Sequence, residues 1–361
     1  MDCHIETELG LDEWSETLKS QLQGKRYPFG GVFEITDRCN LGCVHCYINQ
    51  AAGNKSVKES ELTTIQVKRI LDEMVENGCL YLLLTGGEIL LRPDFEEIYR
   101  HAKKCGFIIN LFTNGTLINP QIADLFSELK PHSIEITLYG ATRETYEKVT
   151  GVPGSYDRCM RGIDLLLERN LPLLLKSVLI SINYHELEDM KTLAEKLGVK
   201  YRYDGLLWPR MDGKKDPLNY QIPLQQLIDL DTQNPERLDE WRRVAERSNG
   251  HTVRNEYLYS CGAGLRSFHI DSHGLMSICT MSRRYSYDLN QMSFRDAWDK
   301  LGELRKLKRQ KETPCQTCSA GAFCVQCPGW SQAVHQDDET PVEFICALGH
   351  QRAKQFGNNH I

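Results

Sequence analysis

The chain of 361 residues is long enough for a large domain plus a smaller one, and its 41% hydrophobic content excludes disorder over the whole length. Its 43 basic and 49 acidic residues leave a net charge of -6 without basic blocks, which argues against nucleic acid or an anionic membrane as a partner. No apolar run approaches the roughly 18 residues of a membrane span, and the acidic start MDCHIETELG is unlike a signal peptide. These features predict a cytoplasmic protein.

Residues 29–205 alternate short apolar runs with longer periodic segments, after an N-terminal segment of residues 1–28. The predicted strands cover residues 31–37, 80–85, 107–112, 133–138, 171–180 and 199–204, and the predicted helices cover residues 58–78, 94–105, 120–129, 155–169 and 185–197. This repeat predicts an α/β fold whose parallel sheet is covered by helices, with the functional site at the carboxyl ends of the strands. Six strands are too few for a closed eight-stranded barrel, so we expect a partial barrel or an open sheet.

The stretch CNLGCVHC follows the first predicted strand and carries Cys39, Cys43 and Cys46 at CxxxCxxC spacing. A structural zinc ion and an iron-sulfur cubane both normally take four protein ligands. Three thiols therefore allow a zinc site completed by His45 or a distant residue, a fully ligated cluster, or a cubane with one iron open to another ligand. The position of the loop at the mouth of the sheet favours the open cubane, because α/β proteins bind their ligands there.

The second predicted strand leads into LTGGEIL, where Gly86 and Gly87 allow close backbone approach and Glu88 is suited to holding a cationic amine. By itself GGE is a weak signal, because glycine pairs end many strands and a glutamate there can also cap the next helix. Its place one strand-helix unit after CxxxCxxC makes the combination specific.

With these two motifs the sequence resembles the radical S-adenosylmethionine (radical SAM) superfamily over nearly the whole chain. The resemblance implies a partial (β/α)6 TIM-like barrel, a [4Fe-4S] cluster on the three cysteines, and contacts of SAM with GGE. One-electron cleavage of SAM at the open iron would yield a 5′-deoxyadenosyl radical that abstracts a hydrogen atom from a substrate. Thr137 matches a family position that contacts SAM, and Asn114 is expected to face the site, although both residue types are also ordinary in strands and turns.

Residues 206–258 are richer in proline, glycine and charge, and we interpret them as a bridging region. The candidates for catalysis are Tyr139 after the fourth strand, Asp204 at the end of the sixth, and Thr280. Trp208 and Arg210 are further candidates for substrate contact, because an arginine near aromatic residues suits a carboxylate or a peptide backbone. A structural role explains each of these residues as well, and no histidine is singled out as a general base.

Residues 259–361 form a cysteine-rich C-terminal region with seven thiols at the spacing of metal ligands: Cys261, Cys279, Cys315, Cys318, Cys324, Cys327 and Cys346. The spacing alone allows one or two zinc knuckles. Behind a radical SAM core, the pattern resembles the small SPASM domain, which carries two auxiliary [4Fe-4S] clusters.

The SPASM resemblance implies a first auxiliary cluster on Cys261, Cys279 and Cys327 and a second on Cys315, Cys318, Cys324 and Cys346. Two features depart from the family pattern. Only two residues separate the last two cysteines of the central motif, where three are common, and no cysteine lies shortly before Cys261. The first auxiliary cluster would therefore have an open iron, a water ligand, or a contribution from His251 or His269.

The resemblance favours a ribosomally made peptide as the substrate. About 28 residues before the first strand are too few for a fused leader-binding domain, so a separate small protein is expected to bind the leader, and a flavodoxin or ferredoxin to supply electrons. Sulfatase maturation is disfavoured, because Thr280 stands where those enzymes have an acidic residue. The alternatives are radical oxidation, dehydration or epimerisation of a small alcohol or sugar and, from another class, a non-enzymatic zinc or iron-sulfur scaffold.

Overall fold

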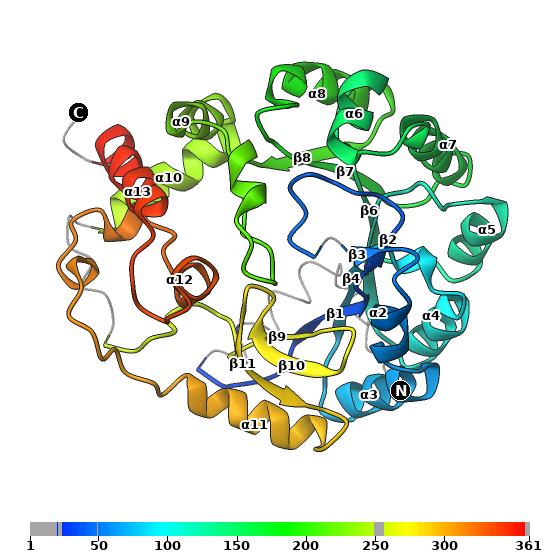
Figure 1. Cartoon of the computed structure of the whole chain (residues 1–361), viewed down its shortest axis with the longest axis horizontal. Coiled ribbons are helices and arrows are strands. Elements are labelled where there is room, and N and C mark those ends of the chain that lie inside the picture. The colour runs from blue at the N-terminus through cyan, green and yellow to red at the C-terminus, as the bar shows by residue number, and fades with distance from the viewer. Residues whose placement is uncertain (1–19, 21–23, 49, 249–255, 358–361) are drawn as a thin grey trace, which may run out of the picture.

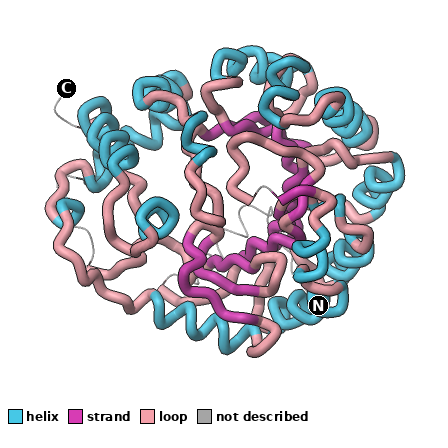
Figure 2. Tube along the Cα trace, viewed as in Figure 1, coloured by secondary structure: helices cyan, strands magenta, loops and turns pink. Residues whose placement is uncertain are grey.

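The computed structural model describes residues 20, 24–48, 50–248 and 256–357. A curved sheet of nine strands, in the order β11-β10-β9-β1-β4-β5-β6-β7-β8, forms the inner layer. Figure 1 shows the helices outside this sheet, and in Figure 2 the strands trace an arc that helices surround. None of the helices in the described residues has the length and apolar character that crossing a membrane requires.

Six strands pair in parallel and form the partial barrel that the sequence predicts. They are β1 (Gly30–Thr36), β4 (Tyr81–Gly86), β5 (Ile108–Thr113), β6 (Ser133–Thr137), β7 (Leu173–Val178) and β8 (Lys200–Asp204). Each predicted strand matches one of these within two residues at either end. The shared direction places all six carboxyl ends at the same edge, where parallel sheets bind their ligands.

Helices cover the outer face of the barrel. They are α3 (Thr64–Glu76), α4 (Phe95–Lys104), α5 (Pro120–Glu128), α6 (Arg143–Thr150), α7 (Ser155–Leu167) and α8 (Leu187–Lys196). The predicted helix over 58–78 is wrong at its start, because α2 (Lys55–Ser60) is separate and α3 begins after a reciprocal cap between Thr63 and Gln66. The short, polar α6 has no counterpart among the predicted helices.

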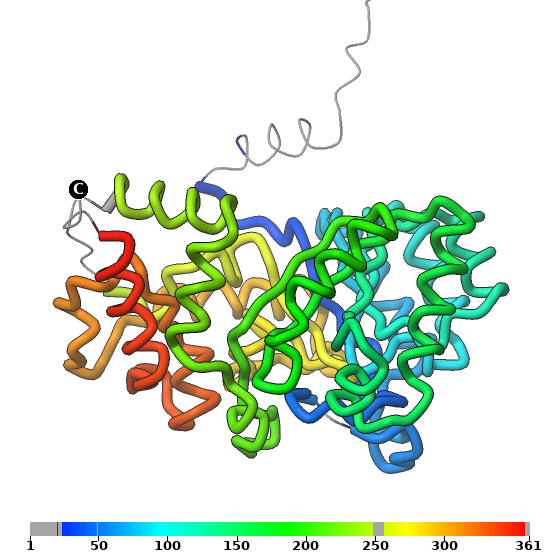
Figure 3. The backbone as a smooth tube through the Cα atoms, turned by 90° about the horizontal axis from the view of Figure 1, so that it is seen from above, coloured from blue at the N-terminus to red at the C-terminus, as the bar shows by residue number. Residues whose placement is uncertain are grey.

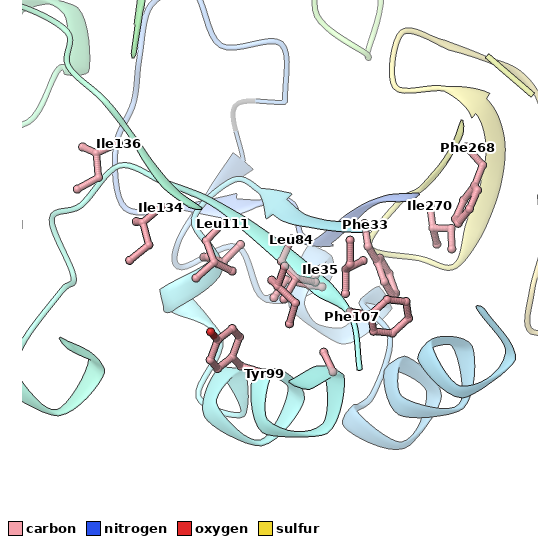
Figure 4. Close-up of a cluster of buried hydrophobic side chains, with 14 of the residues drawn as sticks. Phe33, Ile35, Leu84, Tyr99, Phe107, Leu111, Ile134, Ile136, Phe268 and Ile270 are labelled. Atoms are coloured by element: carbon pink, nitrogen blue, oxygen red, sulfur yellow. The ribbon is translucent and has the colours of Figure 1, made fainter. Parts of the chain in front are cut away.

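The main core lies between the strands and these helices. Along β5, Ile109 and Leu111 point outward and are fully buried, whereas Phe112 lines a cavity inside the barrel. Figure 4 shows Leu111 and neighbouring strand residues above Tyr99 of α4. Burial of such a side chain contributes about 1.5–3 kcal/mol. The outward faces thus hold the barrel together and leave the inward faces for polar residues.

The C-terminal region extends the barrel sheet. β9 (Ser267–Ile270) pairs in parallel with β1, and β10 (Leu275–Cys279) and β11 (Ser282–Asp288) continue the sheet in antiparallel pairs. The sequence pattern predicts no strand here, because β9 has only four residues and β11 is largely polar. The sheet therefore runs across the domain boundary predicted at residue 258.

The bridging residues contain two helices, α9 (Leu224–Gln233) and α10 (Pro235–Ser248), that pack with the C-terminal helix α13 (Glu343–Phe356) beside the barrel, as Figure 3 shows. The other C-terminal helices pack elsewhere, α11 (Phe294–Leu304) on α3 and β10, and α12 (Pro328–His335) on β11. Asp231 of α9 is fully buried and accepts a hydrogen bond from Arg352 of α13 at 2.7 Å. The Arg352 guanidinium also lies over Trp241 of α10, 4.5 Å from the ring centre. The buried ion pair between α9 and α13 thus lies against α10.

A histidine ion pair fastens the β9–β10 turn to the barrel. The Nε2 atom of His273 lies 3.3 Å from the Asp37 carboxylate, and its Nδ1 lies 3.0 Å from the Ser60 carbonyl oxygen. The hydrogen bond to Asp37 raises the pKa of His273 from 6.5 to about 9. Because the folded pKa is raised, the contribution of this pair to stability is complete below pH 6.5 and is lost as the pH rises through about 9.

We expect the apparent melting temperature of the wild-type protein to fall between pH 6.5 and 9 by more than that of a His273→Gln variant. Differential scanning fluorimetry across this range measures both proteins. Because His273 is half-buried and water screens the pair, the effect is modest. Identical pH profiles for the two proteins would contradict the assignment.

Candidate functional site

The cysteine loop, residues 39–46, lies between the short strands β2 (Arg38–Cys39) and β3 (Gln50–Ala51) at the carboxyl end of the barrel. The backbone N–H groups of Gly42 and Val44 donate to the carbonyl oxygens of Thr150 and Val149, the last residues of α6. These bonds explain why an irregular loop holds a fixed position.

A cavity of about 290 Å³, called here the cysteine-loop cavity, separates this loop from the strand ends. It is lined by Cys39, Leu41, Cys43, His45, Cys46, Tyr47, Thr85, Gly86, Gly87, Phe112, Thr113, Asn114, Thr137, Tyr139, Lys176 and Val178. The structure therefore brings the three predicted cysteine ligands together with four of the five predicted cofactor-binding residues.

Burial and mutual repulsion raise the pKa values of Cys39 and Cys43 in the cysteine loop. Burial, with the Glu88 carboxylate, raises the pKa of Cys39 to about 12. Burial also raises the pKa of Cys43 well above its ordinary value, and the sulfurs of Cys46 and Cys39 add to the shift. Three thiols that repel one another as anions fit a positively charged metal centre, because metal binding replaces their protons.

The ligand atoms of a single metal ion lie close to one another. Ligands of one zinc ion, with Zn–S bonds of about 2.3 Å, lie roughly 3.8 Å apart. In the part of the chain that the structure describes, the one group of three metal-type donors within 4.8 Å of one another is Asp72, His101 and Cys105, on the outer helices α3 and α4. The sulfurs of Cys39, Cys43 and Cys46 do not all lie within 4.8 Å of one another.

Gly86 and Gly87 are required by the backbone of the first strand. A Cβ atom on Gly86 would come closer than 3.0 Å to the Thr36 carbonyl oxygen, and one on Gly87 would come equally close to that of Arg38. Gly86 also has a φ of +135°, which side-chain-bearing residues rarely adopt. The glycine pair thus places the end of β4 directly against the start of the cysteine loop.

Glu88, the predicted contact for an amine, is hydrogen-bonded within the protein. Its carboxylate is fully buried and accepts hydrogen bonds from the Thr113 hydroxyl at 2.8 Å, the Asn114 N–H at 2.8 Å and the Leu90 N–H at 3.0 Å. It does not line the cysteine-loop cavity. Glu88 therefore holds the ends of β4 and β5 together.

Asn114 and Thr137 face the cavity as predicted from the sequence. The Asn114 amide donates to Asn40 at 2.9 Å and lies 3.6 Å from the Cys39 sulfur. Tyr139 also lines the cavity, with its ring 5.6 Å from that of His45. Burial and the neighbouring Cys43 raise the pKa of Tyr139 well above 10, so this phenol is not a proton donor of ordinary strength at neutral pH.

Two other catalytic candidates lie elsewhere. Asp204 is exposed, and its carboxylate accepts from the N–H groups of Gly205 at 2.6 Å and Leu206 at 3.1 Å, so it stabilises a turn. Thr280 accepts a hydrogen bond from Arg283 through its carbonyl oxygen, and neither Thr280 nor Asp204 lines the cysteine-loop cavity. Neither side chain is therefore part of the site at the cysteine loop.

The sequence analysis missed Lys176 on β7, the one lysine that lines this cavity. Burial lowers the pKa of its ammonium group to about 7, although Glu135 lies 3.4 Å away and favours the charged form. The signal was present, because a lone lysine interrupts the apolar run LPLLLKSVLI. A strand that is apolar on its outer face displays such a residue to the inside of the barrel.

Residues 33–197 match the sequence profile of the Radical SAM superfamily. The matched segment contains the cysteine loop, the glycine pair and Lys176. Residues 33–197 form a radical SAM domain. As a radical SAM enzyme it is not the non-enzymatic scaffold considered above.

Two relatives align with most of the chain. The AdoMet-dependent heme synthase of Methanosarcina barkeri is 26% identical over 329 residues, which cover 85% of this chain and 93% of the relative. The mycofactocin maturase MftC of Mycobacterium tuberculosis is 28% identical over 319 residues, which cover 84% of this chain and 78% of the relative. The structure of Streptococcus suis SuiB bound to precursor peptide SuiA has a TM-score of 0.64 at 16% identity, covers 91% of this chain and 80% of that chain, and shows the shared fold.

In this radical SAM enzyme the C-terminal cysteines fit a SPASM domain. Burial, with the sulfurs of Cys279 and Cys261, raises the pKa of Cys327, so these three predicted ligands are electrostatic neighbours. Cys318 lies 3.7 Å from the Nε2 atom of His350 on α13, the helix that carries Cys346. This histidine escaped the sequence analysis.

The two histidines considered for the first auxiliary cluster differ in their position. His251 lies outside the described residues. His269 is fully buried, with its Nδ1 3.0 Å from the Ser277 hydroxyl and its Nε2 3.1 Å from the Glu34 carboxylate. Both ring nitrogens therefore face protein partners.

Glu34 of β1 joins the barrel to the C-terminal region. Its carboxylate is fully buried and accepts from Tyr47, next to Cys46, at 2.9 Å and from Arg283 of β11 at 2.8 Å. Burial by itself would raise the pKa of Glu34, but His269 and Arg283 lower it from 4.5 to about 2. One carboxylate thus contacts the cysteine loop, β9 and β11.

A Gly87→Ala variant is expected to bind SAM about ten-fold more weakly, because its Cβ displaces the backbone between β4 and the cysteine loop. Equilibrium dialysis with labelled SAM on the reconstituted enzyme measures this. Gly53→Ala is the control, because its Cβ would meet no atom within 4 Å. Equal SAM affinity of the two variants would refute the role assigned to the glycine pair.

A Glu34→Gln variant is expected to lose about 3–5 kcal/mol of unfolding free energy, because two buried partners lose their counter-charge. Chemical denaturation followed by circular dichroism measures the loss. Glu303→Gln, which removes an exposed pair with Lys306, should cost less than about 1 kcal/mol. The interpretation fails if both variants lose the same amount.

Proposed function

We propose that this radical SAM enzyme abstracts a hydrogen atom from a ribosomally made peptide and thereby modifies it. The observation that carries the proposal is the cysteine-loop cavity, where three thiols face Asn114, Thr137 and Lys176 at the ends of parallel strands. Support for a peptide comes from the maturase MftC, which aligns with 84% of the chain, and from the fold shared with SuiB.

The residues present fit the cofactors of the family. We assign the [4Fe-4S] cluster to Cys39, Cys43 and Cys46, and SAM to the backbone at Gly86–Gly87 with the side chains of Asn114 and Thr137. When bound, cluster and SAM supply a carbon-centred radical that abstracts hydrogen. In this assignment Glu88 holds the ends of β4 and β5 in place beside the cavity.

Other residues of the chain prepare this cavity for radical chemistry. Arg38 and Glu61 form a buried pair at 2.9 Å that anchors the start of the cysteine loop. His45 is kept neutral, because burial lowers its pKa to about 4. The pKa of Lys176 is lowered to about 7, so this amine can hold or release a proton at the cavity wall. Burial thus keeps most of the ionisable side chains of the site neutral.

We further propose that the C-terminal cysteines hold two auxiliary [4Fe-4S] clusters. Cys261, Cys279 and Cys327 would ligate the first, and Cys315, Cys318, Cys324 and Cys346 the second. The close approach of the α13 backbone to Cys324 supports the second set, because a Cβ on Gly349 would lie 3.2 Å from the Cys324 sulfur. A flavodoxin or ferredoxin would supply electrons, and a separate small protein would bind the peptide leader. Such clusters require a reducing compartment, so we place the enzyme in the cytoplasm.

The alignment with the heme synthase of M. barkeri favours a second candidate, a small-molecule substrate of the tetrapyrrole class. The two candidates are separated by incubating the reconstituted enzyme with SAM, a reductant and either substrate. The peptide is one encoded by a small open reading frame beside the gene, and the other substrate is a tetrapyrrole carboxylic acid. A mass change in the peptide alone supports the first candidate, and a change in the tetrapyrrole alone overturns it.

Replacement of Cys39 by alanine is expected to remove about four irons per chain and to abolish SAM cleavage, whereas Cys315→Ala should also remove about four irons but keep a SAM-perturbed EPR spectrum. Anaerobic iron and sulfide quantification with EPR measures both. Cys159→Ala is the control, because Cys159 is buried in the core. Zinc bound in place of iron at the C-terminal cysteines would refute the auxiliary clusters, and SAM cleavage by Cys39→Ala would refute the radical SAM site.

A further inference from the structure

A second cavity, of about 410 Å³, lies beside the cysteine loop and contains three arginines. We call it the arginine cavity. It is lined by Arg210, Met211, Asp212, Gly213, Met281, Arg283, Arg284, Gln332, Ala333 and Gln336. Its volume is that of a typical ligand site.

The arginine cavity lies between the cysteine loop and the predicted first auxiliary cluster. The Met211 N–H donates to the carbonyl oxygen of Tyr47, the residue after Cys46, at 2.9 Å. On the other side, Arg283 donates to the carbonyl oxygen of Thr280, the residue after Cys279, at 2.7 Å. Tyr47 also lines the cysteine-loop cavity, so a substrate in the arginine cavity would lie next to the radical SAM site.

The arginines outnumber the acids among the lining residues, although each arginine also meets a carboxylate. The pair of Arg284 is the loosest, with Asp338 at 3.9 Å. Asp212 is the one acidic residue among the lining residues, and it pairs with Arg210 at 2.8 Å. Arg283 is anchored from behind by the buried Glu34 carboxylate. Among the residues that the structure describes, neither Arg210 nor Arg283 has a hydrogen-bond acceptor for Nη1. The side chains of Arg210 and Arg283 are only 13% and 21% exposed, so their charges are weakly screened.

We propose that the arginine cavity binds a carboxylate of the substrate. Arg210 and Arg283 hold it, Arg284 attracts it at the more exposed rim, and Met211 and Met281 contact the aliphatic stem. The proposal rests on the proposed function and adds to it that the modified substrate is acidic near the reacting position. Arginine fits this task because its planar fork matches a carboxylate with two parallel hydrogen bonds.

Two pairs of probes test the proposal on the reconstituted enzyme with SAM bound. The peptide pair is acetyl-Ala-Ala-Ala-Glu and acetyl-Ala-Ala-Ala-Gln-amide, which differ in their carboxylates. The tetrapyrrole pair is mesoporphyrin IX and its dimethyl ester. Isothermal titration calorimetry and fluorescence titration give the dissociation constants.

We expect the carboxylate-bearing member of one pair to bind about ten-fold more tightly than its neutral partner. Arg210→Gln and Arg284→Gln should each reduce this preference several-fold. Arg283→Lys keeps a cation opposite Glu34, and therefore the fold, while it removes the fork. Arg100→Gln, on the outer face of α4, is the control and should keep the full preference.

Each outcome supports or overturns the cavity, the peptide substrate or both. A carboxylate preference in the peptide pair supports both the cavity and a peptide substrate. A preference in the tetrapyrrole pair alone supports the cavity and overturns the peptide. Equal affinities within both pairs, or a preference that survives all three arginine variants, would overturn the cavity proposal while leaving SAM cleavage untouched.

Discussion

The active end of the barrel depends on one close backbone contact. Where β4 ends, Gly86 and Gly87 press against the carbonyl oxygens of Thr36 and Arg38, which only residues without a Cβ permit. This contact fixes the start of the cysteine loop relative to the strand ends. Glu88 then ties β4 to β5 through the backbone of Asn114, and Asn114 reaches the Cys39 sulfur. The GGE motif therefore joins β4, β5 and the cysteine loop around the cavity.

A second constraint joins the barrel to the C-terminal region. Glu34 is buried with Tyr47, His269 and Arg283, which come from the cysteine loop, β9 and β11. Burying a carboxylate is costly unless it has charged partners, so this arrangement is stable only when all three segments are in place. The same carboxylate orients Arg283 toward the arginine cavity. Folding of the C-terminal region and formation of the Arg283 wall of the arginine cavity are thus coupled.

The sequence predicted the six parallel strands well, because their buried outer faces impose apolar runs such as LYLLLT and FIINLF. It also predicted the three cysteines, the glycine pair, Asn114 and Thr137 at one cavity. It did not predict the hydrogen bonds of Glu88 and Asp204, because a spacing pattern does not tell which backbone groups a carboxylate meets. It named Arg210 as suited to a carboxylate but missed β9, Lys176 and the other arginines of the arginine cavity, because these depend on contacts between residues far apart in the chain.

The pairing of β9 with β1 has a consequence for how the protein is made. β1 is an interior strand of the finished sheet, yet one of its edges waits for residues 267–270, which leave the ribosome more than two hundred residues later. At ordinary synthesis rates of about 5–20 residues per second, that edge stays unpaired for on the order of ten seconds or longer. During this interval the cysteine loop is already outside the ribosome beside an incomplete sheet. The open edge of β1 is therefore exposed to wrong strand pairing until the C-terminal region emerges.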